Sequence, residues 1–233
     1  YKLIEFKDNL TDVFFDLDHT LWDFEKNSFL TFEKIFGEMK LKADLDQFIF
    51  HYNPINHHYW KAYRENRITQ EELRHNRLLD TFNQINFKTT NSQINEISEA
   101  YITYLCTFPH LFKGTIPLLN KLKSKYKLHI ITNGFEHVQH FKIKNSGLDS
   151  YFDFVFTAEQ LGYKKPHPQI FIQALRQTQA DPKKSLMIGD SLEADILGAM
   201  AQGMHAVHFN SHEEERHDKC LIVDSLDELN TFF

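Results

Sequence analysis

Short apolar segments that alternate with longer amphipathic ones constrain the fold of this chain most. These segments are rich in β-branched and aromatic residues and mostly end at a polar or acidic residue; they are 13–15, 128–131, 154–156, 186–188 and 206–209. Helical patterns follow them, and those at 136–146 and 194–202 stop at Gly147 and Gly203, as helix C-caps do. The alternation is typical of βα units. The predicted fold class is therefore α/β, with a doubly wound parallel sheet.

The segment 24–108 has a different pattern. Its apolar residues recur at helical spacing, no convincing strand is present, and 69–72 (Thr-Gln-Glu-Glu) form a capping box. The asparagine-rich stretch 83–95 is most simply a loop between helices. We expect an α/β core made of 1–23 and 109–233, interrupted by an all-helical insertion.

Charge and hydropathy argue against a nucleic-acid polymer and a membrane span. A net charge of −6 disfavours a nucleic-acid polymer, since such binding needs clustered Lys and Arg. No apolar run approaches the roughly 18 residues of a membrane span.

The cysteines, Cys106 and Cys220, are typical of reduced thiols in a cytoplasmic protein.

Residues with reactive or polar side chains follow the predicted strands. In an open α/β sheet, ligands bind beyond the carboxyl ends of the strands, so residues that follow different strands belong to one site. The residues are Asp16 and Asp18, then Thr132, Asn133 and Gly134, then Lys165, and finally Asp190 with Asp195.

This set suits phosphoryl transfer. Asp16 and Asp190 provide the carboxylates that Mg²⁺ prefers beside phosphate oxygens, and Asp16 is placed to attack phosphorus. Asp18 would protonate the leaving group and later activate water. Thr132, Asn133 and backbone N–H groups around Gly134 would hold phosphoryl oxygens. Lys165 would offset the developing negative charge.

The joint pattern resembles the haloacid dehalogenase-like hydrolase superfamily, across essentially the whole chain. The four motifs that carry the resemblance are 16–21 (Asp-Leu-Asp-His-Thr-Leu), 131–134 (Ile-Thr-Asn-Gly), Lys165-Pro166, and 189–191 (Gly-Asp-Ser) with Asp195. The resemblance implies that Asp16 is the nucleophile and Asp18 the acid/base. It also implies that Mg²⁺ is held by Asp16, the backbone carbonyl of Asp18, and Asp190.

Asp195 would be a supporting residue, and the insertion a cap that closes over the site. Hinges would lie near 22–23 and 108–113. His19 has no assigned role.

A narrower resemblance, to the noncanonical pyrimidine nucleotidase branch, comes from Trp60, Tyr63, 68–69, 75–77, Phe135 and Gln139. It implies a 5′-nucleotidase that acts on pyrimidine or modified nucleoside monophosphates. Trp60, Tyr63 and Phe135 would then offer stacking faces to a base. The alternative is that these aromatic residues belong to the hydrophobic core.

Other functions remain open at the level of sequence. A phosphatase or phosphomutase of sugar phosphates or other small metabolites would use the same acidic residues. A haloacid dehalogenase would not need Asp18. A receiver-like phospho-acceptor module is disfavoured by the chain's length and its helical insertion. The histidines at 57, 58, 205, 208, 212 and 217 are expected to be surface or packed residues.

Overall fold

The computed structural model describes residues 7–233, and the chain divides into two compact units. One unit contains the chain up to Phe24 together with His110–Phe233, and the other contains Glu25–Pro109. Within residues 7–233, no helix combines the length and the hydropathy that a membrane crossing requires.

A parallel sheet organises the first unit. Its strands are β1 (Asp12–Phe15), β2 (Lys127–Thr132), β3 (Phe154–Thr157), β4 (Ser185–Gly189), β5 (His205–Phe209) and β6 (Leu221–Val223), in the order β3-β2-β1-β4-β5-β6. All pairings are parallel, and Phe15 is paired with Ile130 and Ile188. The central strands therefore end at the same edge. This confirms the predicted α/β fold, while β6 was not predicted.

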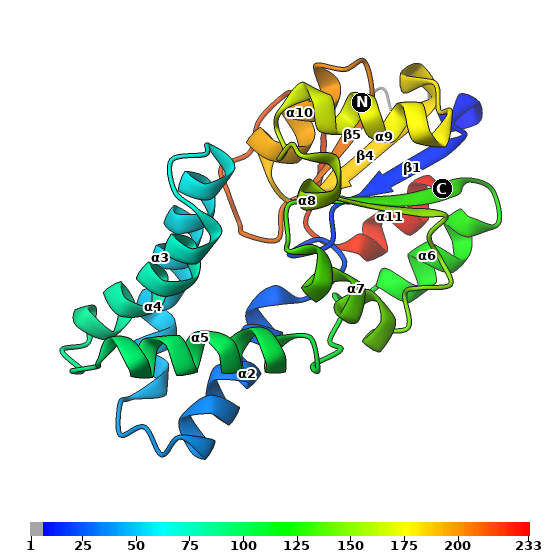
Figure 1. Cartoon of the computed structure of the whole chain (residues 1–233). Helices are drawn as coiled ribbons and strands as arrows, with labels where there is room; N and C mark the ends of the chain where they lie inside the picture. Colours follow the sequence, from blue (N-terminus) through cyan, green and yellow to red (C-terminus); the bar gives the residue numbers. More distant parts are fainter. Residues whose placement is uncertain (1–6) are drawn as a thin grey trace. The chain divides into compact units, whose positions relative to one another are not determined.

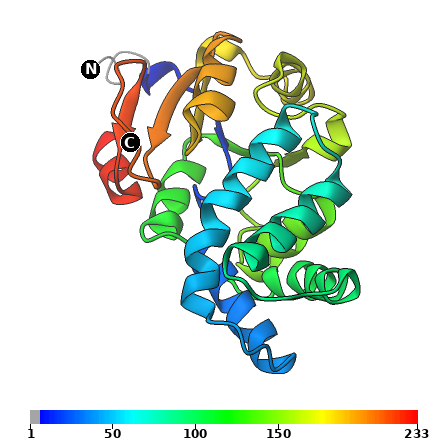
Figure 2. The same ribbon diagram turned by 90° about the vertical axis from the view of Figure 1, so that its left-hand side faces the viewer.

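Helices cover both faces of this sheet (Figure 1). They are α6 (Thr115–Lys123), α7 (Glu136–Asn145), α8 (Ala158–Leu161), α9 (Pro168–Thr178), α10 (Gly198–Met200) and α11 (Leu226–Phe232), with short helical turns η1 (Lys7–Asn9) and η2 (Pro182–Lys184). On the face that carries α9 and α10, Phe14 of β1 packs with Ile170 and Phe171 of α9 and Ala199 of α10. On the other face, α11 lies beside α6 (Figure 2), where Lys121 Nζ donates to a backbone carbonyl of α11.

The helix predicted at 194–202 begins earlier and is irregular. A π-helical turn, η3 (Leu192–Leu197), starts directly after β4 and leads into α10. Ser191 caps it, because its hydroxyl accepts from the N–H of Ala194. The sequence pattern missed this turn because the pattern assumes regular α-helical spacing.

The second unit is all helical, with α2 (Phe24–Glu38, which begins at the boundary), α3 (Leu45–Arg64), α4 (Gln70–Gln84) and α5 (Asn91–Leu105). Aromatic side chains fill its interior, including Phe32, Phe48, Tyr52, Phe82 and Tyr101. The capping box at Thr69 is present as predicted. The predicted loop 83–95 is partly wrong, because a second capping box at Thr90 starts α5 at Asn91.

Candidate active site

Asp16 lies directly after β1 and forms an ion pair with Lys165. The Nζ atom of Lys165 is 2.5 Å from Asp16 Oδ1 and 2.6 Å from Asp195 Oδ1, and Lys165 is only 2% exposed. Asn133 fixes the Lys165 backbone, since its amide nitrogen donates to Lys165 O (2.9 Å) and its amide oxygen accepts from Lys165 N (2.7 Å). A buried ammonium therefore joins two carboxylates that follow different strands.

Burial dominates the electrostatics of this group. It raises the pKa of Asp16 well above its ordinary value, and the charge of Lys165 only partly offsets this effect. The pKa of Asp195 is raised for the same reason. Burial lowers the pKa of Lys165, but the charges of Asp16 and Asp195 outweigh that contribution and raise the pKa overall. Lys165 therefore stays cationic.

Asp190, at the end of β4, has a more polar environment. Burial raises its pKa, but the hydrogen bond from His212, the charges of His19 and His212 and the hydroxyl of Thr20 lower it to about 2. Thr20 Oγ1 donates to Asp190 Oδ1 (3.0 Å), and His212 Nε2 lies 3.1 Å from Oδ2. Asp190 is thus held as a carboxylate.

The carboxylates of Asp16, Asp190 and Asp195 form a cluster suited to a hard cation. All three residues are buried, and one carboxylate oxygen of each lies within 4.8 Å of the other two. Mg²⁺ prefers carboxylate oxygens over nitrogen or sulfur ligands. Burial is the main cause of the raised pKa of Asp16, and repulsion from Asp195 and Asp190 adds to it; a cation here would offset that repulsion. The predicted ligands Asp16 and Asp190 are brought together, and Asp195 lies with them.

Asp18 is held by two residues that the sequence analysis did not assign to it. Lys142 Nζ lies 2.6 Å from Asp18 Oδ1, and Gln139 Nε2 donates to Asp18 Oδ2 at 2.8 Å. Both lie on α7, which follows β2. Their spacing of three residues on a helix was the available signal, because such residues share one helix face.

Thr132 is the last residue of β2, and Gly134 lies in the turn that leads to α7. Thr132 Oγ1 accepts from Gly134 N (3.1 Å) and from Gln139 Nε2 (2.6 Å). Because these two hydrogen bonds use both acceptor sites of Thr132 Oγ1, the hydroxyl hydrogen can be donated to a further acceptor. Asn133 retains a second amide hydrogen beside the one used on Lys165.

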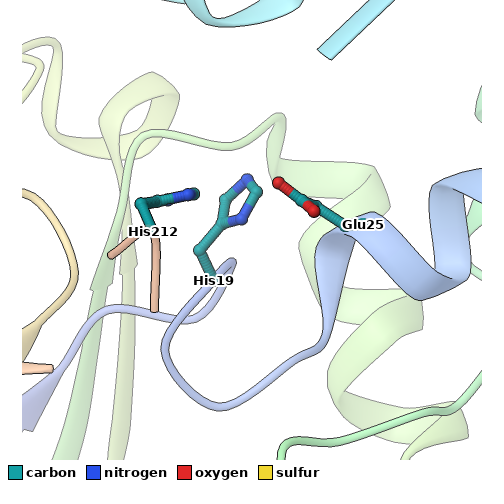
Figure 3. A group of neighbouring side chains, drawn as sticks. All are labelled: His19, Glu25 and His212. Carbon is teal, nitrogen blue, oxygen red and sulfur yellow. The ribbon is translucent and has the colours of Figure 1, made fainter. Parts of the chain in front are cut away.

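His19 and His212 lie next to each other at the same edge of the sheet (Figure 3), with ring centroids 4.5 Å apart. His19 has a φ of 62°, a conformation that favours Gly, Asn, Asp and His, which explains why a histidine is tolerated there. Burial lowers its pKa to about 4. His208 Nε2 contacts Asp190 O (2.7 Å), and His208 Nδ1 contacts His217 Nε2 (2.9 Å). The contacts of His208 and His212 with Asp190 were not predicted.

The aromatic residues expected to bind a base belong to both units. Trp60 and Tyr63 lie on α3, with ring centroids 5.7 Å apart and rings nearly perpendicular. Phe135 is the N-cap residue of α7 in the first unit. Tyr63 and Phe135 are each 8% exposed. Their contact with a substrate stays a prediction.

Comparison with known proteins identifies the family of this chain. The model of the family described as haloacid dehalogenase-like hydrolase matches residues 13–209. The pyrimidine 5′-nucleotidase YjjG of Escherichia coli is 31% identical over 88% of this chain and 88% of its own. A glyceraldehyde 3-phosphate phosphatase of Methanothermobacter thermautotrophicus is 30% identical over 94% of this chain and 98% of its own. The crystal structure of the HAD-hydrolase YfnB of Bacillus subtilis bound to magnesium matches with a TM-score of 0.85 and 26% identity, covering 95% of this chain and 97% of that one. The chain therefore belongs to the haloacid dehalogenase-like hydrolase family, as its four motifs predict.

Proposed function

We propose that this protein is a magnesium-dependent phosphatase that forms an aspartyl-phosphate on Asp16 and hydrolyses pyrimidine or modified nucleoside monophosphates. One observation carries the proposal. The carboxylate of Asp16 is paired with the buried ammonium of Lys165. It lies beside a second buried carboxylate, that of Asp190, which follows β4, the strand adjacent to β1 in the sheet. The same edge of the sheet holds Asp18, whose carboxylate is fixed separately.

Each residue has a defined task in this mechanism. Asp16 attacks phosphorus and forms an O–P bond, while the bond to the leaving oxygen breaks. Asp18 gives its proton to that oxygen, and the alcohol leaves. Asp18 then takes a proton from the attacking water, whose oxygen bonds to phosphorus as the acyl-phosphate bond breaks. Inorganic phosphate is released, and Asp16 is regenerated.

Phosphoryl oxygens would be bound by the Thr132 hydroxyl, the second amide hydrogen of Asn133, and backbone N–H groups around Gly134. Lys165 offsets the negative charge on Asp16 and on the transferred group. Asp195 keeps Lys165 in place through their 2.6 Å ion pair. These contacts align the reacting atoms before the chemical step.

Asp16, Asp190 and the backbone carbonyl of Asp18 would hold Mg²⁺. When bound, the ion neutralises phosphoryl oxygens, so that an anionic nucleophile can approach an anionic substrate. The magnesium-bound structure of YfnB, which this chain resembles along almost its whole length, supports this assignment.

The enzyme class and the substrate rest on different support. The names of the relatives, a nucleotidase and a phosphatase, confirm the expected class, a phosphoric monoester hydrolase. The nucleotide substrate is supported by the similarity to YjjG and by Trp60 and Tyr63, which we assign to substrate selection in the helical unit. The glyceraldehyde 3-phosphate phosphatase relative supports a second candidate, a phosphatase of small sugar phosphates.

A substrate panel with Mg²⁺ distinguishes the two candidates. We expect faster phosphate release from UMP, dUMP or dTMP than from triose and hexose phosphates. A preference for sugar phosphates would remove the nucleotidase assignment and leave the phosphatase mechanism intact.

Two variants test the mechanism itself. Asp16→Asn should abolish turnover of every substrate, and Asp18→Asn should lower it by about 100-fold or more, the range typical of a lost general acid. Circular dichroism should show that both variants remain folded. Near-wild-type activity of either one would refute the mechanism. Chelation by EDTA should stop turnover, and added Mg²⁺ should restore it.

A further inference from the structure

Lys142 is a buried cation that the proposed mechanism does not use. Its side chain is 3% exposed, although lysine is among the residues least often buried. Its ammonium lies 4.3 Å from the ring centroid of Trp22 and 5.4 Å from that of Phe24. Such a group is retained in an interior only where it is paired, and its acidic partner is Asp18, at 2.6 Å.

Gln139 contacts the other oxygen of the same carboxylate. It is fully buried, and its Nε2 atom donates both to Asp18 Oδ2 and to Thr132 Oγ1. The Gln139 side chain packs directly against the backbone of Gly134, where a Cβ atom would lie 2.2 Å from Gln139 Nε2. Residue 134 must therefore be glycine for Gln139 to occupy this position.

We propose that Lys142 and Gln139 are positioning residues that hold the Asp18 carboxylate in one orientation for proton transfer; this rests on the proposed role of Asp18 as the acid/base. One contact on each oxygen fixes the carboxylate plane. Each carboxylate oxygen has two acceptor sites, so a lone pair remains on each for the transferred proton.

Esters with different leaving groups test this proposal. An alkyl phosphate, such as the nucleotide or sugar phosphate that the wild type hydrolyses fastest, needs a proton on its leaving oxygen. p-Nitrophenyl phosphate does not, because nitrophenolate leaves unprotonated. The value of kcat/KM reports the first chemical step, in which Asp16 is phosphorylated. Lys142→Met and Gln139→Met should therefore lower kcat/KM by about tenfold or more for the alkyl ester, which is part of the roughly 100- to 10,000-fold that general acid catalysis supplies. The loss for p-nitrophenyl phosphate should be much smaller.

Two further variants separate positioning from a general effect on the fold. Lys142→Arg keeps the cation and should retain more of the alkyl-ester activity than Lys142→Met. In an Asp18→Asn background, Lys142→Met should add little further loss, because residues that act as a unit are not additive. Equal losses on both esters, or a full additional loss in the double variant, would overturn the proposal.

The outcome is distinguishable from failure of the proposed function. If Asp16→Asn retains activity, the aspartyl-phosphate mechanism is wrong. If Asp16→Asn is inactive while Lys142→Met and Gln139→Met affect both esters equally, only the positioning role is wrong. Should Lys142→Met fail to fold, Gln139→Met and Lys142→Arg still decide the question by the same ratio of kcat/KM values.

Discussion

Replacing Lys165 by methionine should destabilise the protein strongly, and in a way that depends on pH. The substitution keeps the length of the side chain and removes the charge that pairs with Asp16 and Asp195. Breaking a buried ion pair by removing one partner costs about 3–5 kcal/mol, because an uncompensated charge remains. For a chain of this size, that corresponds to a decrease in Tm on the order of 10 °C.

The pH dependence follows from the carboxylates. Burial raises the pKa values of Asp16 and Asp195 above the ordinary 3.8, and Lys165 opposes this shift. Without Lys165, both pKa values rise further, so the folded variant binds more protons than the unfolded one. Its stability therefore increases as pH falls. The deficit relative to the wild type should be largest at about pH 7.5 and smaller at about pH 5.

Thermal melting followed by circular dichroism, with EDTA present, measures both effects. Lys164→Met is the matched control, since the neighbouring side chain is partly exposed and surface substitutions change stability by about 0.5 kcal/mol or less. The double variant Lys165→Met/Asp195→Asn should recover part of the loss, because one of the two unpaired charges is gone. A Tm within about 2 °C of the wild type, well below the change that a broken buried pair produces, would refute the reasoning. So would a loss that is the same at both pH values.

Three further substitutions test separate features of the structure. Gly189→Ala would place a Cβ atom 2.3 Å from Asp195 Oδ2, so Asp195 must move; we expect a loss of about 1–3 kcal/mol in urea unfolding, typical of overpacking. His129, a buried residue of β2, has a pKa that burial lowers below 6.5, so its neutral side chain contributes fully to stability above that pH and less as the pH falls below it. The free energy of unfolding of His129→Gln should therefore decline less between about pH 7 and 5 than that of the wild type. Thr69→Ala removes the hydroxyl that accepts from Glu72 N and should cost the helical unit about 1 kcal/mol, while an unchanged unfolding curve would show that this cap contributes nothing.

The sequence predicted the parallel sheet and the residues that follow its strands, because both depend on local patterns. Apolar runs mark buried strands, and parallel strands necessarily bring their carboxyl ends to one edge. Asp16, Lys165 and Asp190 can therefore be grouped from the sequence. The sequence also contains the second capping box, Thr90 with Gln93, but the surrounding asparagines favoured a loop.

Tertiary contacts account for what was missed. The pairing of Lys142 with Asp18 joins residues 124 positions apart, and nothing in either segment specifies the other. Strand β6 is a short apolar run at the edge of the sheet, where it pairs with β5 alone, and no local pattern relates the two segments. The histidine at 212 resembled a surface residue because it lies in a polar loop, where side-chain direction is not encoded by any period.

The position of His212 has a consequence for divergence within the family. The match to the family model ends at residue 209, yet His212, in the loop that follows β5, donates a hydrogen bond to Asp190. Relatives can thus share every motif residue and still differ in how that carboxylate is oriented and charged. The electrostatics of this acidic cluster therefore depend on a loop that lies outside the matched region as well as on the motif residues.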